Sequence, residues 1–346
     1  MKRKVAAIDG SGVISVQEQD VPPHGPDELL VEVHASLVSP GTELGGVKAR
    51  RENPNPERGP RPFGYQNAGV VLAKGENCRA FETGQRVACM GGGYAQHATH
   101  AVVPRNLAVP LPDPCSFEQG AFNHLAATAL QAIRRAEPQL GETLAVVGLG
   151  LVGQLALQLA RLSGCRTIGI DLIAARLALA EQLGAGLTIN PAQGDSVAAV
   201  RAFTEDDGLD AAVMAFGGEG TQAFEMLLRM MKRAPDTHQM GRIVVVGGCK
   251  INTGYAAKTG NLDVRSSART GPGYHDEDWE RGRDYPPVFV QWDTRRNLQL
   301  CIRLMAEGRL QVDPLVTHRV PLDEAPSACE ELIQHPDRSL GVVLLP

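Results

Sequence analysis

The chain of 346 residues carries 39 acidic and 34 basic side chains, a formal net charge of −5 at pH 7, which argues against nucleic-acid binding as its main role. Its seven cysteines are scattered and include no C-x-x-C pair, which excludes a disulfide framework and a zinc lobe. The chain is long enough for two domains and shows neither a signal-peptide core nor an apolar run that could span a bilayer, so we expect a cytoplasmic protein without a membrane partner.

The first part of the chain is predicted to be rich in β-strands. Short apolar segments at 29–35, 68–73 and 86–89 alternate with glycine and proline. This pattern is not that of a nucleotide-binding βαβ unit.

From about residue 123 the pattern changes to helices that alternate with short apolar strands. Such alternation predicts a parallel, doubly wound sheet and therefore an α/β fold. We expect helices at 154–162, 174–183 and 221–231, and strands at 187–190, 209–215 and 242–247.

The last part of the chain combines an aperiodic segment with further helices and strands. Residues 270–290 are dense in aromatic and charged side chains and have no clear period, which is typical of a functional or a disordered loop. Helices are expected at 294–307 and 323–334, and strands at 316–320 and 341–345. The final strand is expected to return to the first domain.

A glycine motif of the form G-x-G-x-x-G follows the apolar run at 143–147 and leads into an amphipathic segment. Gly148 allows a sharp turn, Gly150 allows the backbone to approach a pyrophosphate, and Gly153 allows the helix to pack close to the strand. The free N–H groups at the start of that helix would face the phosphate charge. The motif predicts a dinucleotide-binding domain.

An acidic residue stands where such domains bind the adenosine ribose. Asp171 ends the next apolar run, 18 residues after Gly153, close to the roughly 20 expected. Its carboxylate would repel a 2′-phosphate, and Leu172 and Ile173 offer no cation, so NAD is favoured over NADP. The alternative is a glycine turn in another βαβ protein, with Asp171 as a helix N-cap. The candidate cofactor-binding residues are Gly148, Gly150, Leu151, Val152, Gly153, Asp171, Arg176 and Gly247.

Three short motifs in the β-rich part resemble those of the medium-chain dehydrogenase/reductase superfamily, which includes zinc alcohol and polyol dehydrogenases. Residues 40–43 read Pro-Gly-Thr-Glu where that family carries Cys-Gly-Thr/Ser-Asp. Residues 64–71 read Gly-Tyr-Gln-Asn-Ala-Gly-Val-Val where it carries Gly-His-Glu-x-x-Gly-x-Val, and residues 84–87 read Gly-Gln-Arg-Val where it carries Gly-Asp-x-Val. The resemblance implies a GroES-like catalytic domain over 1–122 and 293–346 and a Rossmann domain over 123–292.

The departures from the family pattern concern its metal ligands. The positions of the family's three catalytic zinc ligands correspond here to Pro40, Tyr65 and Asn123, which are poor zinc ligands. The four-cysteine lobe of the family's second zinc is missing from residues 89–97. We therefore expect no zinc. An alternative site built on His97, His100 and His124 is disfavoured, because the first two would point to opposite faces of a strand.

A tighter resemblance, carried by residues 39–43, 64–70, 271–274 and 284–286, is to a zinc-free branch. Its members also occur as the first half of two-domain oxidoreductases associated with sugar and polysaccharide metabolism. This resemblance implies carbohydrate metabolism and a sugar or polyol as the substrate.

Without zinc, side chains must stabilise the substrate oxygen and move its proton. Tyr65 is the first candidate for the acid, base or oxyanion donor, although its ring could instead fill the space of the metal. Thr42 corresponds to the family's proton-relaying hydroxyl. Glu43 is either catalytic or paired with an arginine. His124, with an ordinary pKa, would suit a proton shuttle, unless it is a buried structural histidine.

Aromatic and charged side chains of the 270–290 segment suit polyhydroxylated ligands, although a solvated loop or a dimer contact would have the same composition. The candidate substrate-binding residues are Asn123, Tyr274, His275, Trp279 and Tyr285.

Together these features predict a zinc-independent NAD(H)-dependent dehydrogenase that oxidises a secondary alcohol of a sugar, cyclitol or related polyol, or reduces the ketone. One alternative is an enone or quinone reductase using NAD(P)H, which Asp171 disfavours. Another is a dinucleotide-binding protein without turnover. We expect a homodimer that pairs sheet edges through residues 262–267.

Overall fold

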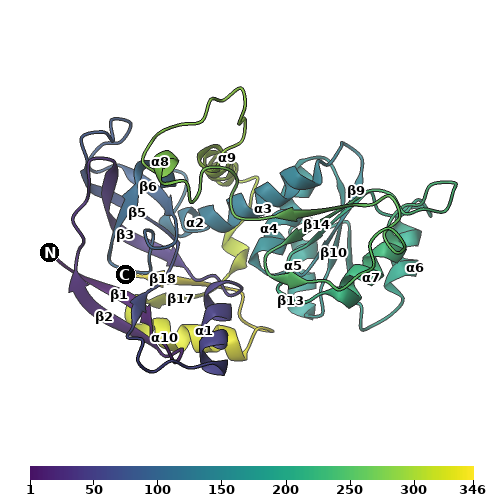
Figure 1. The fold of residues 1–346 in the computed structure, drawn as a ribbon, viewed down its shortest axis with the longest axis horizontal. Coiled ribbons are helices and arrows are strands. Elements are labelled where there is room, and N and C mark those ends of the chain that lie inside the picture. Colours follow the sequence, from purple (N-terminus) through teal and green to yellow (C-terminus); the bar gives the residue numbers. More distant parts are fainter. The chain divides into compact units, whose positions relative to one another are not determined.

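The computed structural model describes residues 1–346, and these form two compact units (Figure 1). Unit 1 comprises Met1–Ala127 and Thr270–Pro346, and unit 2 comprises Thr128–Arg269. The predicted boundaries lay at 122/123 and 292/293. The structure differs chiefly at the second boundary, because residues 270–292 belong to unit 1.

Unit 1 is built on two β-sheets. Its strands are β1 (Lys2–Ile8), β2 (Ile14–Asp20), β3 (Glu28–Leu37), β4 (Arg61–Pro62), β5 (Gln66–Lys74), β6 (Arg86–Met90), β7 (His100–Pro104), β8 (Ala108–Pro110), β17 (Val316–Pro321) and β18 (Gly341–Leu345). The larger sheet has the order β17-β18-β3-β5-β6-β8, with β7 also paired to β3, and the smaller has the order β2-β1-β4. The three strands predicted for this part and both C-terminal strands are present.

Strand β3 lies at the centre of the larger sheet. Leu29, Val31 and Val33 are buried while Glu32 and His34 are exposed, which is the alternation of a strand with one core face. Strand β18 pairs antiparallel with the end of β3. The prediction that the last strand returns to the first domain is therefore confirmed.

The helices of unit 1 cover the sheets and complete the core. Helices α1 (Glu43–Glu52) and α10 (Ala325–Gln334) share an apolar cluster through side chains such as Leu44, Val47 and Leu332. Helix α3 (Asn123–Ala136) begins in unit 1 and ends in unit 2. The others are α2 (Phe117–Gly120), α8 (Glu277–Glu280), α9 (Thr294–Ala306) and the short 3₁₀ turns η1 (Arg105–Leu107), η2 (Asp313–Leu315) and η3 (Leu322–Glu324).

Residues 270–292 join unit 1 because one large side chain is buried there. Trp279 is 0% exposed. The side-chain amide of Asn106 donates to the Trp279 carbonyl at 2.6 Å and to Asp284 Oδ1 at 2.9 Å. A Cβ atom built on Gly273 would lie 2.4 Å from the Trp279 ring, so glycine is required at that contact. The segment predicted as a functional or a disordered loop is thus an ordered part of the unit 1 core.

Unit 2 contains the predicted parallel sheet. Its strands are β9 (Thr143–Val147), β10 (Arg166–Ile170), β11 (Leu187–Ile189), β12 (Ala211–Met214), β14 (Arg242–Val246) and β16 (Asp263–Ser267), with a small pair β13 (Gly218–Glu219) and β15 (Cys249–Lys250) beside them. The sheet order β11-β10-β9-β12-β14-β16 is that of a dinucleotide-binding fold, in which the strand order reverses between β9 and β12. Ligands bind such sheets at the carboxyl ends of the strands on either side of that reversal.

Four helices connect the strands of unit 2, namely α4 (Leu151–Leu162), α5 (Ala174–Gln182), α6 (Ser196–Phe203) and α7 (Thr221–Met230). Phe224 and Leu227 from α7 and Val200 from α6 pack with strand residues such as Ile168 in one apolar core cluster. None of the helices in the protein has the length and apolar character needed to cross a bilayer.

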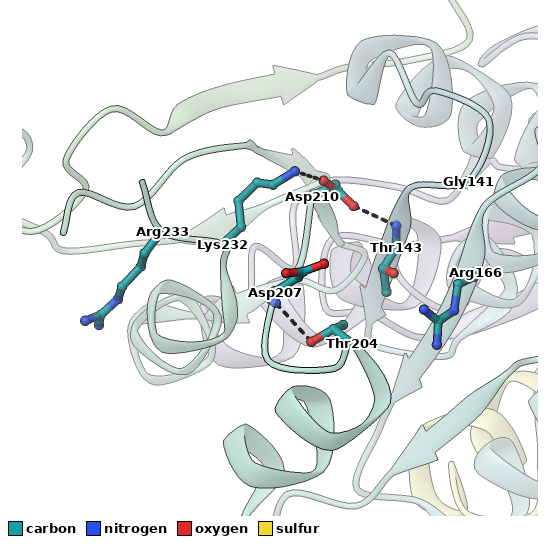
Figure 2. Close-up of a pocket in the computed structure, with 9 residues that line it drawn as sticks. Gly141, Thr143, Arg166, Thr204, Asp207, Asp210, Lys232 and Arg233 are labelled. Carbon is teal, nitrogen blue, oxygen red and sulfur yellow. Dashed lines mark hydrogen bonds and ion pairs between the residues drawn. The ribbon is translucent and has the colours of Figure 1, made fainter. Parts of the chain in front are cut away.

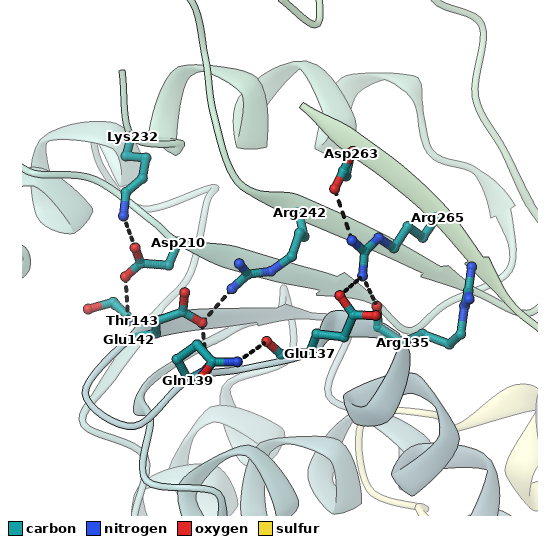
Figure 3. Close-up of polar contacts among 10 residues, drawn as sticks. All are labelled: Arg135, Glu137, Gln139, Glu142, Thr143, Asp210, Lys232, Arg242, Asp263 and Arg265. Carbon is teal, nitrogen blue, oxygen red and sulfur yellow. Dashed lines mark hydrogen bonds and ion pairs between the residues drawn. The ribbon is translucent and has the colours of Figure 1, made fainter. Parts of the chain in front are cut away.

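The amino ends of the unit 2 strands carry a polar network (Figure 3). Asp210 accepts a hydrogen bond from the Thr143 N–H at 2.9 Å and pairs with Lys232, and Glu142 pairs with Arg242. Arg265 on the edge strand β16 pairs with Glu137 at 2.7 Å. These contacts link the strand ends to the preceding loops and stabilise the fold of unit 2.

A shallow hollow of about 350 Å³ opens at the same amino edge (Figure 2). Arg166, Asp207 and Lys232 are among its lining residues. Because parallel-sheet proteins bind their ligands at the opposite, carboxyl edge, this hollow is not the nucleotide site.

We expect Trp279→Ala to destabilise the protein by roughly 3–5 kcal/mol, because it removes a fully buried ring from the core of unit 1. Urea denaturation followed by circular dichroism would measure the change. Trp292→Ala is the matched control, since that ring is 39% exposed and should cost clearly less. Equal effects of the two substitutions would contradict the structural role of Trp279.

Candidate functional site

Tyr65 is held between three segments of unit 1. It precedes β5, its ring lies 4.4 Å from that of His124, and its phenol forms hydrogen bonds with the side chains of Ser39 and Thr42. Ser39 and Thr42 belong to the turn between β3 and α1, so the end of the central strand positions them. The candidate acid/base hydroxyl is therefore held by two neighbouring hydroxyls.

The surroundings of Tyr65 keep its phenol neutral. Burial raises the pKa of Tyr65 above its usual value, and the nearby Glu43 carboxylate raises it further. The hydrogen bonds with Ser39 and Thr42 lower the pKa, but by less than burial raises it. At neutral pH Tyr65 is thus a hydrogen-bond donor and not a phenolate.

His124 lies beside Tyr65 but does not have the ordinary pKa expected from the sequence. Burial lowers the pKa of His124 to about 4, against a smaller rise from its hydrogen bond with the Tyr65 carbonyl. Its Nδ1 lies 3.3 Å from that carbonyl oxygen and therefore carries the hydrogen. At neutral pH the imidazole is uncharged and a weak base, so the reason for proposing it as a proton shuttle is lost.

Glu43, proposed as catalytic or paired with an arginine, is paired with a histidine instead. Its carboxylate is buried, and Oε2 accepts hydrogen bonds from the Ser39 N–H at 2.8 Å and from His97 Nε2 at 3.1 Å. The arginine pairing is wrong because His97 occupies that side of the carboxylate. Thr42, in contrast, is exposed at the start of α1, with no hydrogen bond from its side chain to the helix.

The residues at the family's zinc positions do not fit zinc. Pro40 has no donor atom, Tyr65 is a neutral phenol, and the fully buried Asn123 donates through Nδ2 to the Cys89 carbonyl at 3.2 Å. Nowhere in the protein are three or more His, Cys, Asp or Glu side chains arranged to hold a metal ion. His97 faces Glu43, whereas His100 lies at the start of β7 and contacts Thr99.

Two of the predicted substrate residues in the 270–290 segment join this site. The Tyr274 ring lies 5.6 Å from that of His124, and its hydroxyl accepts the Gly92 N–H at 2.7 Å. His275 is exposed, with its ring 3.9 Å from that of Tyr274. Aromatic faces with polar edges are thus available beside Tyr65.

The other predicted substrate residues are structural. Trp279 is fully buried and stacks against Tyr285 at 6.2 Å. The hydroxyl of Tyr285 donates to Asp276 Oδ2 at 2.6 Å, and this bond raises the pKa of Tyr285 to about 12. Asn123 is also buried. Their polar atoms therefore face the protein, which corrects the assignment of Asn123, Trp279 and Tyr285 to the substrate.

The glycine motif of unit 2 has the geometry of a dinucleotide cradle. Gly148 has a φ of +88° and follows β9, and α4 begins at Leu151, directly after Gly150. No atom would contact a Cβ on Gly150, so the space over the loop is open there. A Cβ on Gly153 would lie 1.8 Å from the Gly148 carbonyl oxygen, so only glycine permits this packing.

Asp171 directly follows β10, at the carboxyl edge of the sheet where a dinucleotide is expected. Its Oδ2 accepts the Leu149 N–H at 2.6 Å and its Oδ1 accepts the Ile173 N–H at 2.8 Å. The N-cap of α5 is Ile173, so Asp171 is not the helix cap of the alternative interpretation. Arg176 Nη1 lies 3.9 Å from Asp171 Oδ2, a cation that the sequence argument about NADP did not take into account.

The remaining predicted cofactor residues occupy the same edge of the sheet. Leu151 and Val152 form the first turn of α4, and Gly247, with a φ of +82°, follows β14. These residues fit a bound dinucleotide, because open glycine loops, a helix N-terminus and a carboxylate meet at the carboxyl ends of the strands.

Three residues were missed by the sequence argument. Ser39 contacts the Tyr65 phenol, Glu280 accepts the His275 N–H at 2.9 Å, and Phe216 lies beside Gly148 at the end of β12. Of these three, only Phe216 could have been found from the sequence, because it closely follows a predicted strand next to the strand-order reversal.

Three curated relatives match most of the chain. YdjJ of Escherichia coli K12, an uncharacterized zinc-type alcohol dehydrogenase-like protein, is 28% identical over 71% of this chain and 77% of its own length. Sorbitol dehydrogenase of Mus musculus is 25% identical over 93% of this chain and 90% of its own. D-guloside 3-dehydrogenase of Escherichia coli K12 is 25% identical over 82% of this chain and 77% of its own.

Solved structures share the fold. An Escherichia coli oxidoreductase of unknown specificity has a TM-score of 0.81 at 22% identity, with coverage of 100% of this chain and 99% of its own. Galactitol-1-phosphate dehydrogenase from Escherichia coli has a TM-score of 0.79 at 21% identity, with coverage of 99% and 100%. A Sinorhizobium meliloti protein described as a zinc-binding dehydrogenase and bound to NADP has a TM-score of 0.76 at 23% identity, with full coverage of both chains. The predicted fold class is confirmed.

A family model described as zinc-binding dehydrogenase matches residues 152–281. The matched range excludes Pro40, Tyr65 and Asn123, so the match carries no information about zinc ligands in this chain. The fold, the glycine motif, the family model and the relatives agree with the resemblance found in the sequence. The chain is thus similar to members of the medium-chain dehydrogenase/reductase superfamily.

Proposed function

We propose that this protein is an NAD(H)-dependent dehydrogenase that works without zinc. It oxidises a secondary alcohol of a sugar, cyclitol or related polyol, or reduces the corresponding ketone. The observation that carries the proposal is the neutral Tyr65 phenol, held by Ser39 and Thr42 at a position where the family carries a zinc ligand. A hydrogen-bond donor at that point takes over the stabilisation of the substrate oxygen.

The relatives support a polyhydroxylated substrate. The names of sorbitol dehydrogenase, D-guloside 3-dehydrogenase and galactitol-1-phosphate dehydrogenase all denote oxidation of a sugar derivative. Tyr274 and His275 offer an aromatic face and polar atoms beside Tyr65, as a ligand with apolar C–H faces and hydroxyl edges requires. The substrate class thus has support both from the relatives and from the site.

In the direction of ketone reduction, Tyr65 donates a hydrogen bond to the ketone oxygen and stabilises the negative charge that develops on it. It then transfers its proton to that oxygen, and the exposed Thr42 hydroxyl passes a replacement proton from water to the phenolate. Alcohol oxidation reverses these transfers. When bound at the glycine motif, NADH supplies the hydride for reduction, and NAD accepts it in oxidation.

Activity of metal-stripped protein is the direct test of this function. NADH formation would be measured with NAD across sugars, cyclitols, sugar acids, sugar phosphates and nucleotide sugars, with NADPH-driven enone and quinone reduction as the comparison. We expect turnover of at least one polyol, unchanged by a chelator, because the residues at the zinc positions are poor ligands. Activity that appears only after zinc is added would refute zinc independence. Activity with enones alone would make the protein a reductase of activated double bonds.

Tyr65→Phe should lower kcat by roughly 10²- to 10⁴-fold, the range for loss of a proton-transferring group. The affinity for NADH should stay unchanged, since the phenol hydroxyl is not among the candidate cofactor-binding groups, the glycine motif and Asp171. Steady-state kinetics and NADH fluorescence titration would measure the two effects. Tyr285→Phe is the matched control, because that hydroxyl is bonded to Asp276, and its kcat should remain close to that of the wild type.

Asp171→Ala should weaken NADH binding by roughly 10- to 100-fold, through lost hydrogen bonds between a charged group and the ribose hydroxyls. The preference for NADH over NADPH should fall as well, because the repulsion of a 2′-phosphate is removed and Arg176 remains. Fluorescence titration with both cofactors would measure this. Asp195→Ala removes a carboxylate that caps α6 and should leave both affinities unchanged. An unchanged preference in the Asp171 variant would refute the assignment of NAD.

We also propose a homodimer that pairs unit 2 sheets. Strand β16 (Asp263–Ser267) is the outer strand of the six-stranded order and coincides with the predicted segment 262–267. An unpaired strand edge is a ready surface for a second copy of the same strand.

A further inference from the structure

A chain of buried polar groups runs beneath the turn that holds Tyr65. His97 is 0% exposed, and its Nε2 lies 3.1 Å from Glu43 Oε2. On the other side of the ring, Nδ1 lies 2.9 Å from the Ser36 hydroxyl at the end of β3. The function proposed above uses neither His97 nor Ser36.

The partners of His97 define its hydrogen-bonding direction. A carboxylate only accepts hydrogen bonds, so Nε2 carries a hydrogen and donates it to Glu43. On the other side of the ring, Nδ1 forms its hydrogen bond with the Ser36 hydroxyl. The ring is therefore fixed at both nitrogens, with its donor toward Glu43.

Glu43 depends on this donor. Its Oε2 receives the hydrogen bonds from His97 and from the Ser39 N–H, whereas its Oε1 is buried with no hydrogen-bond partner. A buried carboxylate that loses one of two donors is strongly destabilised, because nothing replaces its hydration. His97 is thus required to keep the carboxylate in place beneath Ser39.

His97 also touches the segment that leads into Tyr65. Its backbone N–H donates to the Phe63 carbonyl at 3.0 Å, and its ring meets the Phe63 ring edge-on at 5.0 Å. A Cβ on Gly64 would lie 2.4 Å from the His97 nitrogen, so the two segments are in direct contact. His97 therefore contacts one segment that carries Tyr65 and, through Glu43, another that holds its hydroxyl.

We propose that His97 is a positioning residue for Tyr65, which it orients by holding Glu43 and the Ser39–Thr42 turn against the phenol. Its use in catalysis rests on the function proposed above, but the positioning itself does not. The link runs from His97 Nε2 to Glu43 Oε2, then to the Ser39 N–H, and from the hydroxyls of Ser39 and Thr42 to Tyr65.

The same arrangement has an electrostatic consequence. The titratable groups that face the Tyr65 ring are Glu43, Tyr274 and His124. Among these, the Glu43 carboxylate makes the largest contribution to raising the pKa of Tyr65 after burial itself. Holding this carboxylate near the phenol keeps Tyr65 in its hydrogen-donating form.

The positioning can be tested without a substrate by NMR of protein labelled at the tyrosine ¹³Cζ atom. The chain has five tyrosines, and Tyr65→Phe assigns the signal of Tyr65. We expect His97→Leu and Glu43→Gln to displace or broaden this signal, while the signals of Tyr94, Tyr255 and Tyr285 stay in place. His97→Gln, whose amide can donate to Glu43, should restore the wild-type position. His100→Leu is the matched control, because that ring contacts Thr99 and not Glu43.

Kinetics then separate this proposal from the proposed function. His97→Leu should lower kcat by roughly 10- to 100-fold, as expected for a misplaced reacting group, with KM for NAD unchanged and recovery in His97→Gln. A displaced Tyr65 signal in a protein that turns over no polyol would support the positioning and refute the function. An unmoved Tyr65 signal in both His97→Leu and Glu43→Gln would overturn the positioning, whatever the activity.

Discussion

Strand β3 is the element on which unit 1 depends. It pairs with β5, β7 and β18, so three separate stretches of chain are aligned by one strand. The turn that follows it carries Ser39 and Thr42, and its last residues include Ser36. The position of the candidate catalytic hydroxyls is therefore set by the central strand of a sheet and not by a free loop, which favours a preorganised site.

In the proposed function, a donated hydrogen bond takes the place of a metal ion at the substrate oxygen. A zinc ion would stabilise an alkoxide through its charge, whereas a neutral phenol does so through one donated hydrogen. A phenol is effective only if it remains protonated and correctly aimed. Burial and Glu43 secure the first condition, and contacts with Ser39 and Thr42 secure the second. In the proposed function, the Glu43 carboxylate thus helps to keep the phenol protonated.

Much of the fold could be predicted from the sequence because its signals are local. The Gly148–Gly153 motif, the spacing to Asp171 and the apolar periodicity of α4 and α7 each lie within a short segment. The pairing of Glu43 with His97 could not be predicted, because these residues lie 54 positions apart and meet only in the folded sheet. Likewise, the lowered pKa of His124 and the buried ring of Trp279 depend on packing that no local pattern reveals.

Unit 1 is formed by two stretches of chain that are separated by unit 2, so its folding depends on residues synthesised at different times. Unit 2 is one continuous stretch, Thr128–Arg269, so all its contacts become possible once that stretch has left the ribosome. Unit 1 lacks β18, the neighbour of β3, until residues 341–345 have been synthesised. Domains fold as units during synthesis, and pairings distant in sequence form slowly. The end of β3 at Ser36 and Leu37 therefore stays unpaired on this side while the nucleotide-binding unit folds, and an unpaired strand edge can pair with another chain.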